Sequence, residues 1–178
     1  MPLIKQRQVQ TNDKWQFWLP EEATAANALE VDSALNLPEQ NWVEALVVPA
    51  EFLEQVDLKR VGHLGASLNT DQDYEILLPW LEQLQLIALD FLAFRDGRGF
   101  SQARLLRRAG FKGELRALGD IGRDRLAYLE KCGFDSFYIP DERFKAADLT
   151  AFTEIKVAYQ SATNHLKPAT SKVGSHVA

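Results

Sequence analysis

Short apolar runs recur along the middle of the chain, separated by segments in which apolar and charged positions alternate with a helical period. The clearest run is residues 86–94, LIALDFLAF, which holds a single charged position. Continuous apolar runs are typical of strands buried on both faces, whereas a period of 3.6 residues is typical of amphipathic helices. The pattern therefore predicts five buried strands, at residues 45–48, 61–68, 86–94, 114–118 and 136–139.

Two amphipathic helices are predicted between the last three strands, over residues 101–109 and 123–132, with Ser101 as the N-cap of the first. Gly110 and Gly133 each follow one of these helices, and each precedes a phenylalanine. Glycine at this position predicts a left-handed backbone that ends the helix, with the next side chain folded back onto its last turn. Each helix should therefore turn sharply into the following strand.

Weaker signals flank this region. Residues 15–19, WQFWL, predict an edge strand that Pro20 stops. Other helical segments are predicted at residues 51–56, from Asp71 or Asp73 to residue 84 with a kink at Pro79, and at residues 148–161.

These elements imply a single α/β domain over residues 42–162, with a peripheral segment at 1–41 and a disordered tail at 163–178. Strands that alternate with helices through short links form mainly parallel sheets with right-handed crossovers. About five strands are too few for a closed eight-stranded barrel. We therefore expect alternating βα units in a partial TIM-barrel-like fold, with an open three-layer sheet as the alternative.

Composition narrows the class of protein. The 178 residues are 46% hydrophobic and 25% charged, as in ordinary soluble globular proteins. The single cysteine excludes an internal disulfide, and no apolar run reaches the length of a signal peptide or a membrane span. A cytoplasmic protein without a membrane partner is the expectation. The net charge of −5 argues against nucleic-acid binding, which normally needs a broad basic face.

Charge is unevenly distributed. Residues 95–131 contain ten Lys/Arg and five Asp/Glu, so this window is +5 and the rest of the chain is −10. A basic island on an acidic protein attracts anions or acidic partners locally. The alternative is that Arg104, Arg107, Arg108 and Arg125 only solvate the outer faces of the two helices.

Polar residues follow the predicted strands, where parallel α/β folds gather their chemistry. One loop after a strand carries aspartate, arginine and glycines that permit a positive φ and a close backbone approach to a ligand. The next such loop, GDIGR, repeats the aspartate and arginine. These residues predict an anion-binding rim, and the alternative is that they only shape tight turns. The predicted ligand-binding residues of the two loops are Asp96, Gly97, Arg98, Gly99, Asp120 and Arg123.

Two charged residues inside the strands complete the predicted rim. Asp90 interrupts an apolar strand, and Arg116 has a similar place in the next strand. A buried carboxylate needs a partner, so we expect Asp90 and Arg116 to pair across adjacent strands. Such a pair would either belong to the site or only set the strand register.

No motif names a catalytic residue or a cofactor. The chain has no GxGxxG after a strand, no GK[ST] and no HExxH, and no spacing specific enough for a metal site. His63 is more simply explained as a structural histidine. Cys132, before a helix-ending glycine, is expected to be packed rather than reactive.

The stretch from LIALDFLAFRDGRGF through GELRALGD to LEKCGF, with FTEIKVAYQ further on, resembles the bacterial domain-of-unknown-function family 934. The resemblance covers roughly residues 42–162. It implies an accessory or oxidoreductase-linked protein of assimilatory sulfite reduction, without implying a reaction or a cofactor.

Three functions remain open on these grounds. The first is an accessory protein that acts beside sulfite reductase, and the second is a small enzyme that binds an oxyanion or phosphate at the rim. The third is a non-catalytic assembly factor whose basic helices dock on an acidic protein. A partial barrel also leaves uncovered sheet edges, so a homodimer is expected to be favourable.

Overall fold

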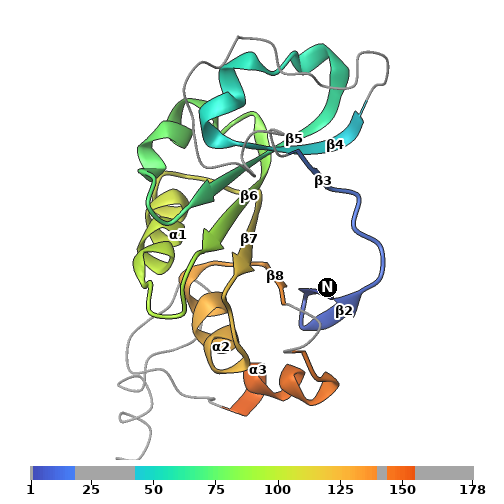
Figure 1. Cartoon of the computed structure of the whole chain (residues 1–178), viewed down its shortest axis with the longest axis vertical. Coiled ribbons are helices and arrows are strands. Elements are labelled where there is room, and N and C mark those ends of the chain that lie inside the picture. The colour runs from blue at the N-terminus through green and yellow to red at the C-terminus, as the bar shows by residue number, and fades with distance from the viewer. Residues whose placement is uncertain (1, 19–42, 140–143, 155–178) are drawn as a thin grey trace, which may run out of the picture.

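The computed structural model describes residues 2–18, 43–139 and 144–154. Eight strands form one sheet in the order β2-β1-β8-β7-β6-β5-β4-β3, and the sheet curls into a half-barrel (Figure 1). The chain is therefore a mixed α/β protein, and the open three-layer alternative does not describe it. The strands are β1 (Leu3–Lys5), β2 (Gln8–Gln10), β3 (Gln16–Phe17), β4 (Val43–Pro49), β5 (Val61–Asn69), β6 (Leu84–Phe91), β7 (Glu114–Gly119) and β8 (Ser136–Tyr138).

All five buried strands expected from the apolar runs are present, as β4 to β8, and neighbours among them pair in parallel. The sheet is nevertheless larger than the expected five strands. The edge strand expected near Trp15 forms as β3 and pairs in parallel with β4. At the opposite edge, β1 and β2 add an antiparallel hairpin that no apolar run indicated, because three-residue strands carry too little pattern.

Regular alternation of strands and α-helices is wrong for the first half of the domain. The links from β4 to β5 and from β5 to β6 contain only 3₁₀ helices. In the second link Asp73 caps the helix through the Glu75 amide, as expected, but Pro79 lies within it and supplies no amide hydrogen. The helical elements are 3₁₀ helices at Ala50–Gln55, Leu58–Arg60, Tyr74–Trp80 and Ala146–Thr150, and the α-helices α1 (Arg98–Arg108), α2 (Arg123–Cys132) and α3 (Ala151–Glu154).

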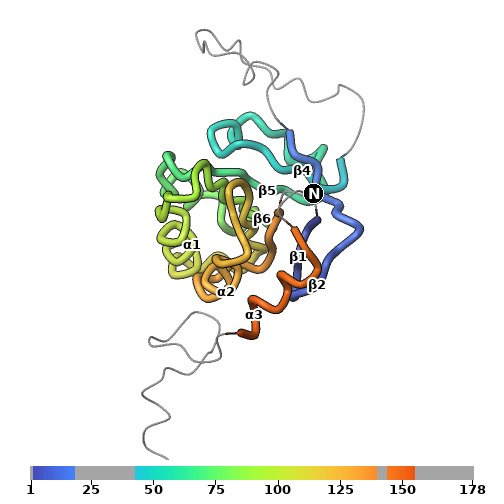
Figure 2. The backbone as a smooth tube through the Cα atoms, turned by 60° about the horizontal axis from the view of Figure 1, so that its bottom comes forward, coloured from blue at the N-terminus to red at the C-terminus, as the bar shows by residue number. Residues whose placement is uncertain are grey.

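The main core lies between the sheet and the helices, which cover the outside of the curled sheet (Figure 2). Alternate side chains of each strand point to this core or to the concave face. In β6, Ile87 and Leu89 join the main core, whereas Leu86 and Ala88 form a second, smaller cluster with Val47. The concave face is therefore partly apolar, and Trp15 and Leu118 pack on it.

The N-terminal residues close the open side of the half-barrel. The hairpin β1–β2 stands at one edge of the sheet and β3 at the other, so residues 11–15 cross from edge to edge (Figure 1). We call residues 11–15 the N-terminal belt. The sequence indicated a peripheral segment here, and no local pattern shows that it spans the concave face.

The helix ends follow the sequence in part. Gly110 and Gly133 have φ angles of 101° and 106°, and the amides of Phe111 and Phe134 bond back into the last helical turns, as expected. The expected N-cap is wrong, because α1 begins at Arg98 and Ser101 lies inside it.

Some expected features fall outside the described residues. These are the end of the helix expected at 148–161, the tail at 163–178 and residues 19–41 of the peripheral segment. Within the described ranges, no helix has the length and apolar character needed to cross a membrane.

Candidate functional site

The first predicted loop is held together by its own charges. Arg98 donates to both carboxylate oxygens of Asp96, at 3.0 and 2.8 Å, and pairs with Asp71 at 2.6 Å. Asp96 also accepts hydrogen bonds from the Thr70 hydroxyl and from the Arg98 amide. These bonds, with that of Arg98 foremost, hold the pKa of Asp96 well below its usual range. Arg98 thus already has two carboxylate partners within the chain.

The two glycines of this loop do not have the role that the sequence suggested. Gly97 has a φ of −98°, and Gly99 is not among the glycines with positive φ. A Cβ atom at Gly99 would lie 2.6 Å from the Phe91 ring, whereas one at Gly97 would meet nothing within 4 Å. Gly99 is therefore needed for helix–sheet packing. Neither glycine has the positive φ that was expected to let the backbone approach a ligand.

The second predicted loop is also engaged internally. The Asp120 carboxylate accepts the Phe94 amide at 2.9 Å, which ties the loop after β7 to the loop after β6. Arg123 pairs with Asp148 at 3.5 Å, pairs with Glu154, and donates to the Thr150 hydroxyl at 3.1 Å. Its function in the structure is to attach α2 to the C-terminal helical segment.

The expected ion pair between Asp90 and Arg116 is wrong. Their strands are adjacent, but Asp90 is level with Leu118, and Arg116 is level with Ala88. Arg116 is only 1% exposed and binds other partners on the concave face. Its guanidinium donates to Asp13 of the N-terminal belt at 2.5 and 3.2 Å, to Glu114 at 2.9 and 3.2 Å, and to Ser136 at 3.3 Å.

Asp90 stands apart from the other predicted residues. Its side chain is half-buried at the C-terminal end of β6, and in the described part of the chain no hydrogen bond or ion pair reaches its carboxylate. A Cβ atom at Gly119, which has a φ of 84°, would lie 2.3 Å from an Asp90 oxygen. Burial raises the pKa of Asp90. Among the eight predicted residues, this one has an uncompensated ionisable group.

Sequence reasoning missed the N-terminal contribution to this region. Besides Asp13, Lys5 pairs with Glu114 at 2.5 Å, across 109 positions of sequence. Both residues belong to the segment that was expected to be peripheral. No signal in a single sequence links positions so far apart, so this part of the network was not predictable.

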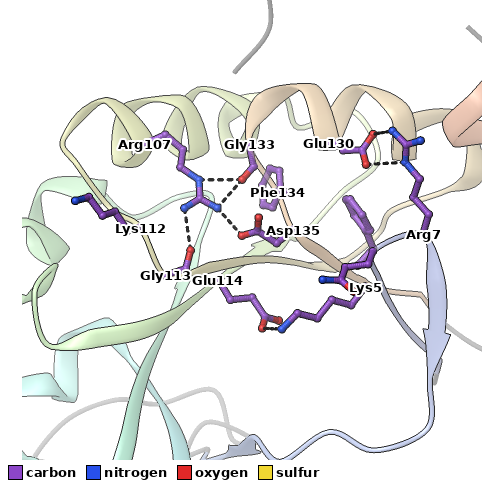
Figure 3. A pocket seen from close by; sticks show the side chains of 12 residues that line it. Lys5, Arg7, Arg107, Lys112, Gly113, Glu114, Glu130, Gly133, Phe134 and Asp135 are labelled. Atoms are coloured by element: carbon purple, nitrogen blue, oxygen red, sulfur yellow. Dashed lines mark hydrogen bonds and ion pairs between the residues drawn. The ribbon is translucent and has the colours of Figure 1, made fainter. Parts of the chain in front are cut away.

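A groove lies at the opposite end of the strands from the predicted rim, between the β1–β2 turn and the starts of β7 and β8 (Figure 3). Its volume is about 850 Å³. Arg107 binds the Gly133, Gly113 and Phe111 carbonyls and pairs with Asp135 at 2.5 Å. Its bonds close the ends of the two helices, so Arg107 is a structural residue and not a free cation.

The remaining charges of the groove are largely compensated. Arg7 makes a two-pronged bond to Glu130, at 3.0 and 2.9 Å, and Lys5 holds Glu114 (Figure 3). Lys112 is the cation of this lining with no ion pair among the described residues. The groove therefore offers little unsatisfied chemistry despite its size.

The outer surface of α1 and α2 carries stacked arginine and aromatic side chains. The Arg125 guanidinium lies 4.0 Å from the Phe94 ring centroid and 5.7 Å from that of Phe100. Phe100 packs on Tyr128 at 5.0 Å, and Arg104 lies 5.9 Å from the Tyr128 ring. Phe94 and Tyr128 are 46% and 48% exposed. We call these five residues the arginine–aromatic surface.

Cys132 is buried beneath this surface. Burial is the largest effect on its thiol and raises its pKa, although Arg104 and Tyr128 act in the opposite direction. Cys132 is packed as expected, and a raised pKa makes its thiol a poor nucleophile.

The family model described as a bacterial protein of unknown function, DUF934, matches residues 65–170. The chain belongs to the DUF934 family. The DUF934 match includes all eight predicted rim residues and the arginine–aromatic surface, whereas Lys5 and the N-terminal belt lie outside it. A comparison with curated proteins finds no match.

Proposed function

We propose that this DUF934 protein is a cytoplasmic accessory protein that docks on an acidic protein partner, and that the partner is assimilatory sulfite reductase. The observation that carries the docking function is the arginine–aromatic surface of α1 and α2. The connection to sulfite reduction rests on the sequence resemblance alone.

The surface has the composition of a protein interface. Tyrosine, phenylalanine and arginine are enriched in interface cores, where they supply contact area together with directional hydrogen bonds. Two such aromatic rings, Phe94 and Tyr128, are half-exposed here, and the exposed Leu92 lies near Phe94 in the sequence. Stacking on Tyr128 and Phe94 also orders the guanidinium groups before binding, which reduces the entropy lost on association.

The positive charges of α1 favour an acidic partner. Helix α1 contains four arginines and no acidic residue. Arg98 and Arg107 have carboxylate partners within the chain, but Arg104 and the exposed Arg108 have no ion pair among the described residues. Uncompensated cations beside exposed aromatic rings complement a surface rich in Asp and Glu.

A second candidate is a small enzyme at the rim, and Asp90 is the observation that favours it. A half-buried carboxyl with a raised pKa at a strand end is suited to proton transfer. The oxyanion that such an enzyme would bind has less support, because Arg98, Arg116 and Arg123 already bind carboxylates of the chain.

Charge reversal tests the docking candidate. Purified sulfite reductase is titrated with the wild-type protein, with Arg104→Glu/Arg108→Glu, and with Arg98→Ala as the matched control. Docking through α1 predicts that the double reversal weakens binding by more than about tenfold, the scale of interface hot spots, and that Arg98→Ala does not. Equal loss in both variants, or no binding of the wild type, would contradict the docking proposal. Light scattering of the isolated protein, measured first, tests the homodimer that the uncovered edges of a partial barrel led us to expect.

Deletion of the gene tests the pathway. A strain without it should fail to grow with sulfate or sulfite as the sulfur source and should recover with sulfide. Complementation with the Arg104→Glu/Arg108→Glu variant should fail, whereas Arg98→Ala should restore growth. Normal growth of the deletion strain on sulfite would remove sulfite reduction from the proposal.

A further inference from the structure

A second polar pocket lies on the concave side of the half-barrel, beneath the N-terminal belt. Its volume is about 610 Å³, and its lining comes from the β1–β2 hairpin, the belt and strands β5 to β7. At its base is Arg116, a charged side chain almost completely removed from solvent. The pocket is therefore built from segments that meet only in the folded protein.

The acidic groups of this pocket are fully used by the chain. Both oxygens of Asp13 accept bonds from Arg116. One oxygen of Glu114 accepts from Arg116 and from the Ser136 hydroxyl at 2.6 Å, and the other accepts from Lys5. Burial alone would raise the pKa of Glu114, but these bonds lower it, so the carboxylate stays ionised. Two cations and two anions thus compensate one another.

Some other hydrogen-bond donors of the pocket, in contrast, have no acceptor among the described residues. The Gln85 carbonyl oxygen accepts the Leu64 amide at 2.8 Å, which leaves its NH₂ group without an acceptor in the described residues. His63 and Lys14 also line the pocket and have no hydrogen-bond acceptor or ion pair there. Both lie beside Trp15, with the Lys14 ammonium 5.8 Å and the His63 ring 6.4 Å from the indole.

We propose that this pocket binds a small oxyanion, with Lys14, His63 and Gln85 as donors and Trp15 as the apolar wall. An anion matches the lining because the carboxylates are occupied by the chain, whereas Lys14, His63 and Gln85 can reach a ligand and have no protein acceptor among the described residues, and Lys14 is the charge left without an ion-pair partner there. A metal cation would find no available carboxylate. The larger groove of Figure 3 also has one uncompensated cation among the described residues, Lys112, so it is the competing location for an anion.

Gly65 of β5 lies directly beneath Trp15, one wall of the pocket. A Cβ atom at Gly65 would lie 3.1 Å from both Trp15 and Val47. Glycine at this position therefore lets the indole approach β5, and the approach brings the belt with Lys14 against the sheet. The belt and β5 therefore pack closely against each other beside Lys14 and His63.

Titration of the full-length, ¹⁵N-labelled protein with sodium phosphate and sodium sulfate tests this site. The reporter is the indole N–H signal of Trp15, assigned with Trp15→Phe, and sodium chloride at equal ionic strength controls for general salt effects. We expect a saturable shift with an oxyanion. Lys14→Gln should weaken binding by roughly tenfold, the scale of a charge-assisted hydrogen bond, and His63→Gln should weaken it by less.

Two matched variants locate the anion. Lys112→Gln removes the uncompensated cation of the other groove and Arg98→Gln removes a rim arginine, and neither should change the affinity by more than about twofold. A shift that does not saturate, or one that Lys112→Gln or Arg98→Gln abolishes while Lys14→Gln does not, would overturn the proposal. Arg104→Glu/Arg108→Glu should retain anion binding, so failure of docking and failure of this site are separable.

Discussion

Asp90 is the one charged residue of strand β6. A carboxylate in an apolar strand is unfavourable unless it is paired, so the sequence marked it correctly as an anomaly. The partner inferred for it, Arg116, is instead drawn to Asp13 and Glu114. Asp90 is left half-buried with its negative charge uncompensated by any described residue, which makes it a candidate functional group.

Replacing Asp90 by Asn should therefore stabilise the protein at neutral pH. Since burial raises the pKa of Asp90, the folded state binds a proton more tightly than the unfolded state, and ionisation destabilises the fold. That cost is fully present above the folded-state pKa and disappears as the pH falls towards the ordinary value for aspartate, about 3.9. The difference in Tm between Asp90→Asn and the wild type should be positive at pH 7.5 and shrink with acidification. A variant that is less stable at pH 7.5 would mean that the carboxylate has a partner.

At the scale of elements, the ends of α1 and α2 follow local chemistry closely. Gly110 and Gly133 were recognised as C-terminal caps because a left-handed residue there is a property of the chain within one turn. The start of α1 was misplaced because Gly97 supplies no side-chain cap, and the Asp96 carboxylate, one residue earlier, accepts the Arg98 amide instead.

The two caps should differ in their tolerance of a side chain. Alanine at either site adopts a left-handed conformation, which costs about 1–2 kcal/mol of the free energy of unfolding. At Gly110 a Cβ atom meets nothing within 4 Å, but at Gly133 it would lie 2.9 Å from Arg107 Cγ. Because Arg107 also binds the Gly133 carbonyl, it has little freedom to move. Chemical denaturation should therefore find Gly133→Ala less stable than Gly110→Ala, and the reverse order would contradict this account.

At the scale of the whole molecule, the N-terminal belt turns an open half-barrel into a closed unit. It joins two sheet edges that are at opposite ends of the strand order. The contact between Asp13 and Arg116 fastens its middle to the concave face, across 103 positions of sequence. A charge as deeply buried as Arg116 depends on its partners, so this contact should matter more than the exposed ion pairs.

Asp13→Ala should consequently lower the free energy of unfolding by about 1–3 kcal/mol, the cost of a buried charge that loses a partner. Asp71→Ala is the matched control, since the Arg98–Asp71 pair is exposed and should contribute less than about 1 kcal/mol. In a double-mutant cycle, Asp13→Ala combined with Arg116→Met should cost less than the sum of the single changes. Additive costs would show that the belt is not fastened through this pair.

The sequence by itself determined the five central strands, the two helices, their glycine caps and the packed Cys132. Each depends on apolar periodicity or on backbone conformation within a few residues, which a single chain displays directly. It also identified Asp90, because a charge inside an apolar run is visible without a fold.

Only the tertiary structure decided which charges meet. Arg98 and Arg123 were expected to face a ligand but bind carboxylates of their own chain, and Gly99 packs on Phe91. Arg116 found its partner in the N-terminal belt, which then encloses the pocket with Lys14 and His63. Ion pairs depend on the positions of side chains in space, and a residue type with its local pattern does not specify a partner a hundred positions away.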